Sequence, residues 1–256
     1  MRFLRYRTSS GESQQGWVLD GLIGPVEGSI FGEFQRKDLE IPLESARLQP
    51  PIRPGKIVCI ARNFVDHARE HQAEVPEVPL LFLKPPSAII GPDQPIYIPP
   101  QSHQVEHEAE LAVVISRRGR WISTQEALNH VLGYTIANDV TARDLQWRDG
   151  QWARGKGFDT FCPLGPWIET EFDPADALIT CHVNGEMRQM ASTRDMVFSI
   201  QKLIAFASSV MTLEPGDILL TGTPAGVGPL LPGDIVEISI EGIGVLQNPV
   251  SAEPVT

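Results

Sequence analysis

The chain reads, over residues 106–115, Glu106-His107-Glu108-Ala109-Glu110-Leu111-Ala112-Val113-Val114-Ile115. The apolar end of this stretch, rich in β-branched residues, predicts a buried strand over 108–115. Residues two apart on a strand share one face, so the side chains of Glu108 and Glu110 begin roughly 6.5–7 Å apart on the same side. This strand therefore carries two carboxylates into the edge of the core, where uncompensated negative charge is costly.

Two interpretations of the carboxylate pair are open. The pair is either part of an oxygen-ligand site for a hard cation, Mg²⁺ or Mn²⁺, or the solvent face of an edge strand on which Glu alternates. A third acid, Asp139, directly follows the apolar run 132–137 and Asn138. Asp139 is either a further ligand at the end of a buried strand or the N-cap of the helix that follows.

The rest of the chain predicts an α+β protein that is mainly β. Periodicity and turn residues predict strands at 57–60, 80–83, 96–98, 108–115, 132–137, 179–183, 186–190 and 236–240. Three helices are expected: a short one over 66–74, one of about two turns after Ser123-x-x-Glu126, and a long one from Ser192-x-x-Asp195 to about 213. With Gly and Pro at 22 residues each, a helical bundle is disfavoured.

A proline-rich linker divides the chain. Residues 49–55 read Gln-Pro-Pro-Ile-Arg-Pro-Gly, and three prolines favour an extended path. We therefore expect a small β-rich N-terminal domain over 1–50 and a catalytic domain over 51–256.

Composition excludes several classes of protein. The chain has 21 basic and 32 acidic residues, a net charge of −11, so nucleic acids and anionic membranes are not expected partners. Three cysteines without a C-x-x-C pattern fit reduced thiols in a cytoplasm. The N-terminus lacks the apolar stretch of a signal peptide, and prolines interrupt the longest uncharged run. We expect a cytoplasmic protein.

A second constellation surrounds His67. On a helix, His67 and Glu70 are neighbours three residues apart, so the carboxylate can orient the imidazole as a general base. The same residues spell H-x-x-E-H with His71, a zinc-peptidase motif, although that motif needs a longer helix and a third ligand elsewhere. A surface helix of mixed charge is the third possibility. A Gly-rich loop with Thr223 and a lone cation, Lys156, are weaker signals.

Seven segments together resemble the fumarylacetoacetate hydrolase family. They are Ile60-Ala-Arg-Asn-Phe-Val-Asp-His67, Leu81-Phe-Leu-Lys-Pro-Pro-Ser-Ala88, His107-Glu-Ala-Glu-Leu-Ala-Val-Val114, Gly133-Tyr-Thr-Ile-Ala-Asn-Asp-Val-Thr-Ala-Arg-Asp144, Lys156-Gly-Phe-Asp-Thr-Phe-Cys-Pro-Leu-Gly165, Val183-Asn-Gly-Glu186 and Leu220-Thr-Gly-Thr-Pro-Ala-Gly-Val-Gly228. The resemblance spans roughly residues 52 to 245, in the family's order. Phe64 departs from the Tyr that many members carry, which removes a hydroxyl near the lid.

The resemblance implies a mixed β-sandwich roll, a homodimer, and a role for each matching residue. It assigns one Mg²⁺ or Mn²⁺ per chain to Glu108, Glu110 and Asp139, and leaves Glu106 structural. It assigns a catalytic dyad on a mobile lid to His67 and Glu70, and a substrate-holding role to Lys156. It assigns substrate binding to Arg62, Arg143, Gln146 and Thr223.

The resemblance also implies an activity. The short form with a small lead-in domain is similar to acylpyruvate hydrolases, fumarylpyruvate hydrolases and oxaloacetate decarboxylases, which break a C–C bond of a 2,4-dioxo or β-keto acid through a metal-stabilised pyruvate enolate. The alternative is a 2-hydroxyhepta-2,4-diene-1,7-dioate isomerase or a 5-oxopent-3-ene-1,2,5-tricarboxylate decarboxylase. Remote alternatives are a zinc peptidase and a non-catalytic acid-binding protein. The expected substrate is a small 2-oxo or dicarboxylic acid.

Overall fold

Strands are the main regular structure of the molecule, and one long sheet runs through it. The computed structural model describes residues 1–8 and 10–254. In these residues the main sheet has the order β4-β3-β2-β1-β15-β13-β12-β18-β7-β8, with β5, β6 and β9 attached at its sides. Its strands are β1 Arg2–Arg7, β2 Ser13–Leu19, β3 Leu22–Gly28, β4 Phe34–Arg36, β5 Ile41–Pro42, β6 Arg47–Gln49, β7 Ile57–Ala61, β8 Leu80–Lys84, β9 Ile89–Ile90, β12 Ala109–Ile115, β13 Val131–Asn138, β15 Cys162–Glu169 and β18 Ile218–Leu220.

Two smaller sheets complete the β structure. One has the order β10-β21-β20-β16-β17, and the other has the order β14-β11-β19. Their strands are β10 Ile96–Ile98, β11 Val105–His107, β14 Thr141–Ala142, β16 Leu178–Val183, β17 Glu186–Ser192, β19 Gly228–Pro229, β20 Ile235–Ile240 and β21 Gly244–Ala252. The Asn184-Gly185 turn joins β16 to β17 with both residues at positive φ, as the hairpin prediction requires. The mixed, mainly β fold is the one predicted.

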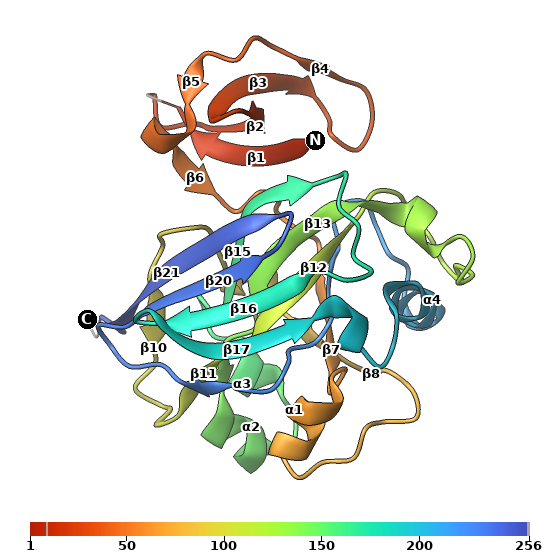
Figure 1. Cartoon of the computed structure of the whole chain (residues 1–256), viewed down its shortest axis with the longest axis vertical. Helices are drawn as coiled ribbons and strands as arrows, with labels where there is room; N and C mark the ends of the chain where they lie inside the picture. Colours follow the sequence, from red (N-terminus) through yellow and green to blue (C-terminus); the bar gives the residue numbers. More distant parts are fainter. Residues whose placement is uncertain (9, 255–256) are drawn as a thin grey trace.

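The helices lie at the edges of this β structure. They are α1 Val65–Glu70, α2 Arg143–Asp149, α3 Ala153–Lys156 and α4 Ile200–Val210. Figure 1 shows α1, α2 and α3 gathered at the lower end of the molecule, beneath β11 and β7, with α4 at one side. In the described residues no helix is long and apolar enough to cross a bilayer.

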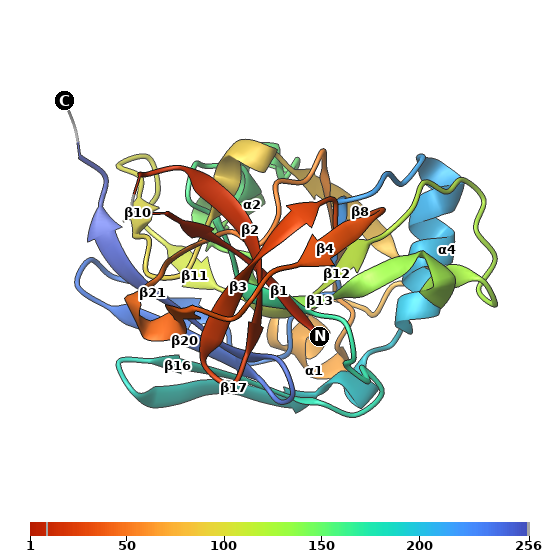
Figure 2. The ribbon, with the colours of Figure 1, turned by 90° about the horizontal axis from the view of Figure 1, so that it is seen from above.

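The predicted N-terminal segment packs on the rest of the chain through paired strands. In Figures 1 and 2, β1 to β6 form a layer that lies over the main body at the end opposite α1 and α2. The contact is a strand pair, because Arg2 and Phe3 of β1 face Glu169 and Ile168 of β15. Phe3 also belongs to the same buried apolar cluster as Ile57 and Leu220 of the central strands. The division into domains at residues 50 and 51 stays a prediction, and residues 9, 255 and 256 lie outside the described residues.

Each of the three expected helices differs from the structure, and α2 and α3 are not among those expected. Helix α1 ends at Glu70 rather than Glu74, because Gln72 takes a left-handed φ of 51° just past the C-cap His71. After Ser123 the chain makes only a 3₁₀ helix over Ala127–His130 before it enters β13. A two-turn α-helix does not fit between that turn and the strand.

The third difference concerns the long helix. The Ser192–Asp195 capping box is present, but it closes a 3₁₀ turn over Thr193–Asp195, and α4 begins after Ser199. Two of the residues in between are held by Asn63, whose side chain accepts a hydrogen bond from the Phe198 N–H at 2.7 Å and whose backbone carbonyl accepts one from the Val197 N–H at 2.8 Å. A contact with a distant loop therefore delays the helix.

Candidate active site

Antiparallel pairing of β12 and β13 brings two of the predicted carboxylates together. Glu108 immediately precedes β12, and Asp139 immediately follows β13, whose Asn138 faces Ala109 across the pair. The Asp139 N–H donates to the Glu108 carbonyl at 2.9 Å, and the Glu108 N–H donates to Asn138 Oδ1 at 2.9 Å. Asp139 does not cap a helix, because α2 begins at Arg143 after Ala142. The two acids thus meet where two buried strands leave the sheet.

Glu110 completes a cluster of three buried carboxylates. One oxygen from each of Glu108, Glu110 and Asp139 lies within 4.8 Å of the other two, and all three side chains are buried. Glu110 accepts a hydrogen bond from the Gly222 N–H at 2.7 Å. Burial, together with the charges of Asp139 and Glu108, raises the pKa of Glu110 well above its ordinary value. The edge-strand interpretation of these acids is therefore wrong.

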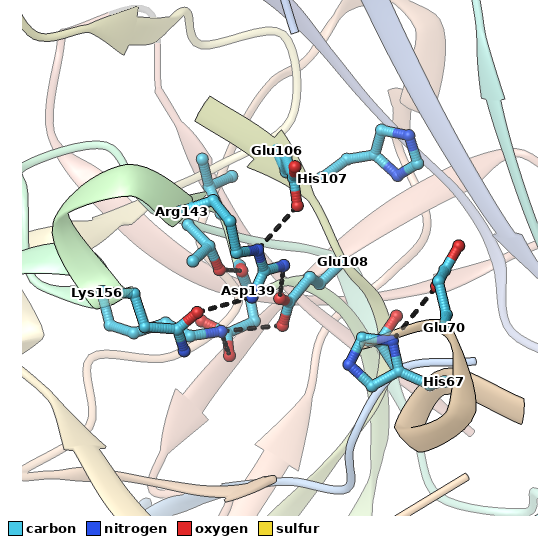
Figure 3. A network of polar contacts seen from close by, with 12 residues as sticks. His67, Glu70, Glu106, His107, Glu108, Asp139, Arg143 and Lys156 are labelled. Carbon is cyan, nitrogen blue, oxygen red and sulfur yellow. Dashed lines mark hydrogen bonds and ion pairs between the residues drawn. The ribbon is translucent and has the colours of Figure 1, made fainter. Parts of the chain in front are cut away.

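Three buried cations surround these acids, and Figure 3 shows two of them converging on the carboxylates. Lys156 Nζ lies 2.7 Å from Glu108 Oε2 and 2.7 Å from Asp139 Oδ2. Lys84 Nζ lies 2.6 Å from Asp139 Oδ1. Arg143 pairs with Glu106 at 2.7 Å and also with Glu108. Burial works against the charge of Glu108, but Lys156 and Arg143 hold the pKa of its carboxyl well below the ordinary value.

The charge distribution fits a divalent cation at the carboxylates. Among the described residues, Glu106, Glu108 and Asp139 each pair with a buried cation, whereas Glu110 has only the Gly222 N–H. A buried carboxylate that is short of positive charge is costly, and that cost is reflected in the raised pKa of Glu110. Three carboxylates offer the oxygen ligands that Mg²⁺ and Mn²⁺ prefer.

The predicted His67–Glu70 pair lies on α1, facing the acids. His67 Nδ1 is 3.5 Å from Glu70 Oε2 (Figure 3). The Gly226 N–H donates to the two Glu70 carboxylate oxygens at 3.1 and 3.2 Å. Burial lowers the pKa of His67 from 6.5 to about 4, so the imidazole is neutral across the physiological range. A neutral imidazole beside a cavity can accept a proton, as a general base must.

One small cavity joins these groups. Its volume is about 140 Å³, and it is lined by Ile60, Ala61, Arg62, His67, His71, Phe82, Glu108, Glu110, Asp139, Arg143, Gln146, Trp147, Trp152, Lys156 and Thr223. Nine of the ten residues assigned to the site from the sequence line it. Glu70 is the exception, and it reaches the cavity only through His67. Phe64 is buried in the main apolar cluster and is not among the lining residues, so its missing hydroxyl does not alter the cavity wall.

The Thr223 hydroxyl is held by an amide behind the cavity. Gln189 Nε2 donates to Thr223 Oγ1 at 2.8 Å and to the Pro224 carbonyl at 2.8 Å. Gln189 Oε1 accepts from the Ala109 N–H at 3.1 Å and lies 3.0 Å from His107 Nδ1. Because the Thr223 oxygen accepts from Gln189, its own hydrogen is free to donate into the cavity.

Sequence reasoning missed several residues of this site. Lys84 stands in a segment that matches the family, and the only further signal for it is that a lysine at the end of an apolar strand needs a buried carboxylate partner. His71 is indicated only by the H-x-x-E-H spacing, and yet it lines the cavity. Gln189 and His107 come from different sheets, and the spacing of residues 107 and 189 in the sequence does not predict their contact.

Comparisons with known proteins agree with this geometry. The family model "Fumarylacetoacetate (FAA) hydrolase C-terminal" matches residues 56–251, and the model "Rv2993c-like, N-terminal" matches residues 1–51. The mitochondrial oxaloacetate tautomerase FAHD2B of Bos taurus is 49% identical over 215 residues, which are 79% of this chain and 68% of the relative.

Two solved structures extend the likeness to the whole chain. A 2-hydroxyhepta-2,4-diene-1,7-dioate isomerase from Mycobacterium marinum has a TM-score of 0.91 at 42% identity, covering 100% of both chains. A fumarylacetoacetate hydrolase from Exiguobacterium antarcticum has a TM-score of 0.86 at 39% identity, covering 99% of this chain and 100% of the other. Three different activities are thus named on one scaffold.

Proposed function

The chain belongs to the fumarylacetoacetate hydrolase family, and from that premise we propose that it is a divalent-cation-dependent enzyme that moves a proton at C3 of a small 2-oxo dicarboxylic acid, with oxaloacetate as the substrate. The observation that carries the proposal is one cavity lined by three carboxylates, several cations and a neutral histidine. The zinc-peptidase interpretation is wrong, because the family is a different one and α1 has only six residues.

Glu108, Glu110 and Asp139 would hold the cation, Mg²⁺ or Mn²⁺. When bound there, a divalent cation supplies Lewis-acid polarisation of the 2-oxo group, which makes the neighbouring C–H more acidic. The chain prepares the site for it: Lys84 and Lys156 fix Asp139, and Arg143 and Lys156 fix Glu108. Positioned partners of this kind keep ligand oxygens in place and tune their basicity.

His67 is placed to take the C3 proton and to return it. Its imidazole is neutral at physiological pH, it lies at the cavity wall, and Glu70 is within 3.5 Å of its Nδ1. Glu70 is itself held by the Gly226 N–H. In the enol-to-keto direction the neutral imidazole would first take the enol O–H proton, and the imidazolium so formed would then give a proton to C3, so the tautomerisation needs no further acid.

The cations and hydroxyl of the cavity suit the substrate's two carboxylates. Arg62 and Arg143 line the cavity with Thr223, whose hydroxyl hydrogen is free. Lys156 lines the cavity and is also buried against Glu108 and Asp139. It would therefore contact the substrate while it holds those two acids.

Cavity size favours a short substrate. About 140 Å³ is less than half of the roughly 300 Å³ at which cavities for drug-sized ligands begin. A four-carbon acid suits this volume better than a seven-carbon diene-dioate does. The tautomerase name of the bovine relative points to the same substrate.

Cleavage of a C–C bond in an acylpyruvate or in oxaloacetate is the second candidate. The observation in its favour is that the His67 imidazole lines the cavity, where it can take a proton from a water molecule instead of from carbon. Cleavage would develop negative charge on the same 2-oxo oxygen. The hydrolase or decarboxylase activity therefore stays a prediction beside the tautomerase proposal.

The test follows the ultraviolet absorbance of oxaloacetate enol as it returns to the keto form, once with Mg²⁺ and once with a chelator. The same protein is then assayed for three other reactions: hydrolysis of acylpyruvates and fumarylpyruvate, decarboxylation of oxaloacetate, and turnover of diene-dioates. We expect Mg²⁺-dependent tautomerisation with the highest kcat/KM. Faster cleavage would support the second candidate instead. Absence of all these reactions would leave a non-catalytic acid-binding protein.

A further inference from the structure

A second cluster of metal-ligating side chains lies on α1 and its C-cap. His67, Glu70 and His71 each offer one ligand atom within 4.8 Å of the other two. The two imidazoles pack edge to face with centroids 4.7 Å apart, and His67 Nδ1 is 3.5 Å from Glu70 Oε2. Residues at i, i+3 and i+4 share one face of a helical turn, which accounts for this convergence.

Two nitrogens of this cluster are buried and lack a hydrogen-bond partner in the described part of the chain. They are His67 Nδ1 and His71 Nε2, and the His67 side chain is 9% exposed. An unpartnered buried polar atom costs free energy and calls for a ligand. Burial, as the largest cause, lowers the pKa of both imidazoles, so their nitrogen lone pairs are available at neutral pH.

We propose that His67, Glu70 and His71 form a second cation site, selective for Zn²⁺ and similar borderline metals, and that an ion bound there inhibits the enzyme. Two imidazoles and a carboxylate are a ligand set that Zn²⁺ uses, whereas Mg²⁺ prefers oxygen alone. The inhibition rests on the proposed function, since coordination would occupy the base, His67. The fourth position would be taken by water.

The ligand atoms of the cluster lie up to about 1.4 Å farther apart than those of a bound site, although His67 Nδ1 and Glu70 Oε2 are already 3.5 Å apart. Ligands at 2.0–2.1 Å from a tetrahedral zinc are roughly 3.4 Å apart, against separations of up to 4.8 Å here. Glu70 and His71 can make the adjustment because both are partly exposed at the surface of α1. The movement would weaken the hydrogen bond from the Gly226 N–H to Glu70, so zinc would also loosen the loop that contains Thr223.

The test measures Zn²⁺ affinity by competition with a chromophoric chelator, using chelator-stripped full-length protein and excess Mg²⁺. We expect one Zn²⁺ per chain in the wild type. We expect about tenfold or weaker affinity in His71→Gln, which is a loss of about 1.4 kcal/mol or more. His103→Gln, which removes an exposed histidine outside the cluster, is the matched control and should bind like the wild type.

A further variant shows which site the ion occupies. Glu110→Gln breaks the carboxylate cluster, and it should keep the wild-type Zn²⁺ affinity. Co²⁺ bound to the protein should show the intense visible absorption of a tetrahedral site, and His71→Gln should lose it. Equal Zn²⁺ affinity in the wild type and His71→Gln, or loss of affinity in Glu110→Gln, would overturn the proposal.

Inhibition is measured separately, as the Zn²⁺ concentration that halves Mg²⁺-dependent turnover. If Zn²⁺ binds with the affinities expected for the wild type and the variants but does not reduce turnover, the proposal that the ion inhibits the enzyme is overturned. Because affinity and Co²⁺ absorption need no substrate, the zinc site is tested even if the 2-oxo acid activity fails.

Discussion

Gln189 has the clearest positioning role of any residue outside the cavity. Every hydrogen-bonding group of its amide is used, with Ala109 and His107 on the oxygen and Thr223 and Pro224 on the nitrogen. This arrangement fixes which atoms of the amide face Thr223, and therefore makes the Thr223 hydroxyl a donor toward the cavity. A donor in that place binds a substrate carboxylate in the ground state and the transition state alike.

We therefore expect Gln189→Met to raise KM for oxaloacetate about tenfold while kcat stays within a few-fold, since uniform binding is lost. Thr223→Val should raise KM by a similar factor. The KM of the double variant should be little higher than that of either single variant, because Gln189 acts on the substrate through Thr223. Steady-state kinetics of the four proteins give the answer. A fall in kcat with unchanged KM would show that Gln189 does not act through substrate binding.

Burial of His67 makes a prediction about pH. The unfolded chain takes up a proton at this residue below about pH 6.5, but the folded chain does so only near pH 4. The contribution of His67 to stability is therefore fully present above pH 6.5 and is lost as the pH falls through 4. In His67→Gln this loss is absent. The stability of the wild type relative to that variant should fall progressively between about pH 6.5 and 4.

Urea unfolding of the two metal-free proteins at several pH values measures this difference. Other titrating groups are common to both proteins, so they cancel. A difference in the free energy of unfolding that is constant with pH, or one that grows in favour of the wild type as the pH falls, would rule out a buried neutral imidazole at His67.

At the scale of elements, local signals predicted the strands well and the helices poorly. The strand β12 follows from its continuous apolar run with β-branched residues, and the hairpin of β16 and β17 follows from Asn184-Gly185. The start of α4 does not, because Asn63, 137 positions before Ile200, accepts hydrogen bonds from the N–H groups of residues 197 and 198 and keeps these residues out of the helix. Capping residues such as Ser192 and Asp195 indicate where a helical turn begins, but tertiary contacts determine how many residues the helix includes.

The candidate site shows the same limit. Glu108, Glu110 and Asp139 were within reach of sequence reasoning, since spacing on one strand and position at a strand end both point to the same edge. Lys156 was not, because its isolated position between glycines is also that of a solvated lysine, and only the family resemblance singled it out. Burial against Glu108 and Asp139 is a property of how α3 packs.

For the whole molecule, the shared core of the N-terminal segment and the central strands has a measurable consequence. Phe3 is 3% exposed, packs edge to face on Phe34 at 5.3 Å, and belongs to a cluster that includes Ile57 and Leu220. Phe3→Ala should cost about 3–5 kcal/mol, in one unfolding transition that includes the residues lining the cavity. Leu19→Ala, at a residue 51% exposed, is the control.

Urea unfolding followed by tryptophan fluorescence and by Mg²⁺-dependent activity tests this prediction. If Phe3→Ala produced a separate early transition and left the midpoint of activity loss unchanged, residues 1–50 would be an independently folding domain. The homodimer implied by the family resemblance stays a prediction, which sedimentation of the wild-type protein addresses.

Proton transfer at C3 of a 2-oxo acid, assisted by a cation on Glu108, Glu110 and Asp139, is the central step of the function proposed for this protein. It is measured most directly as exchange of the C3 hydrogens of pyruvate for deuterium in D₂O, followed by NMR. The wild type should catalyse exchange with Mg²⁺ and should stop when a chelator is added. Glu110→Gln should lower the rate by about 10²-fold or more, whereas Glu171→Gln, at an exposed acid distant from the cavity, should not. Exchange that persists with a chelator, or at the wild-type rate in Glu110→Gln, would contradict a cation-assisted reaction at this site.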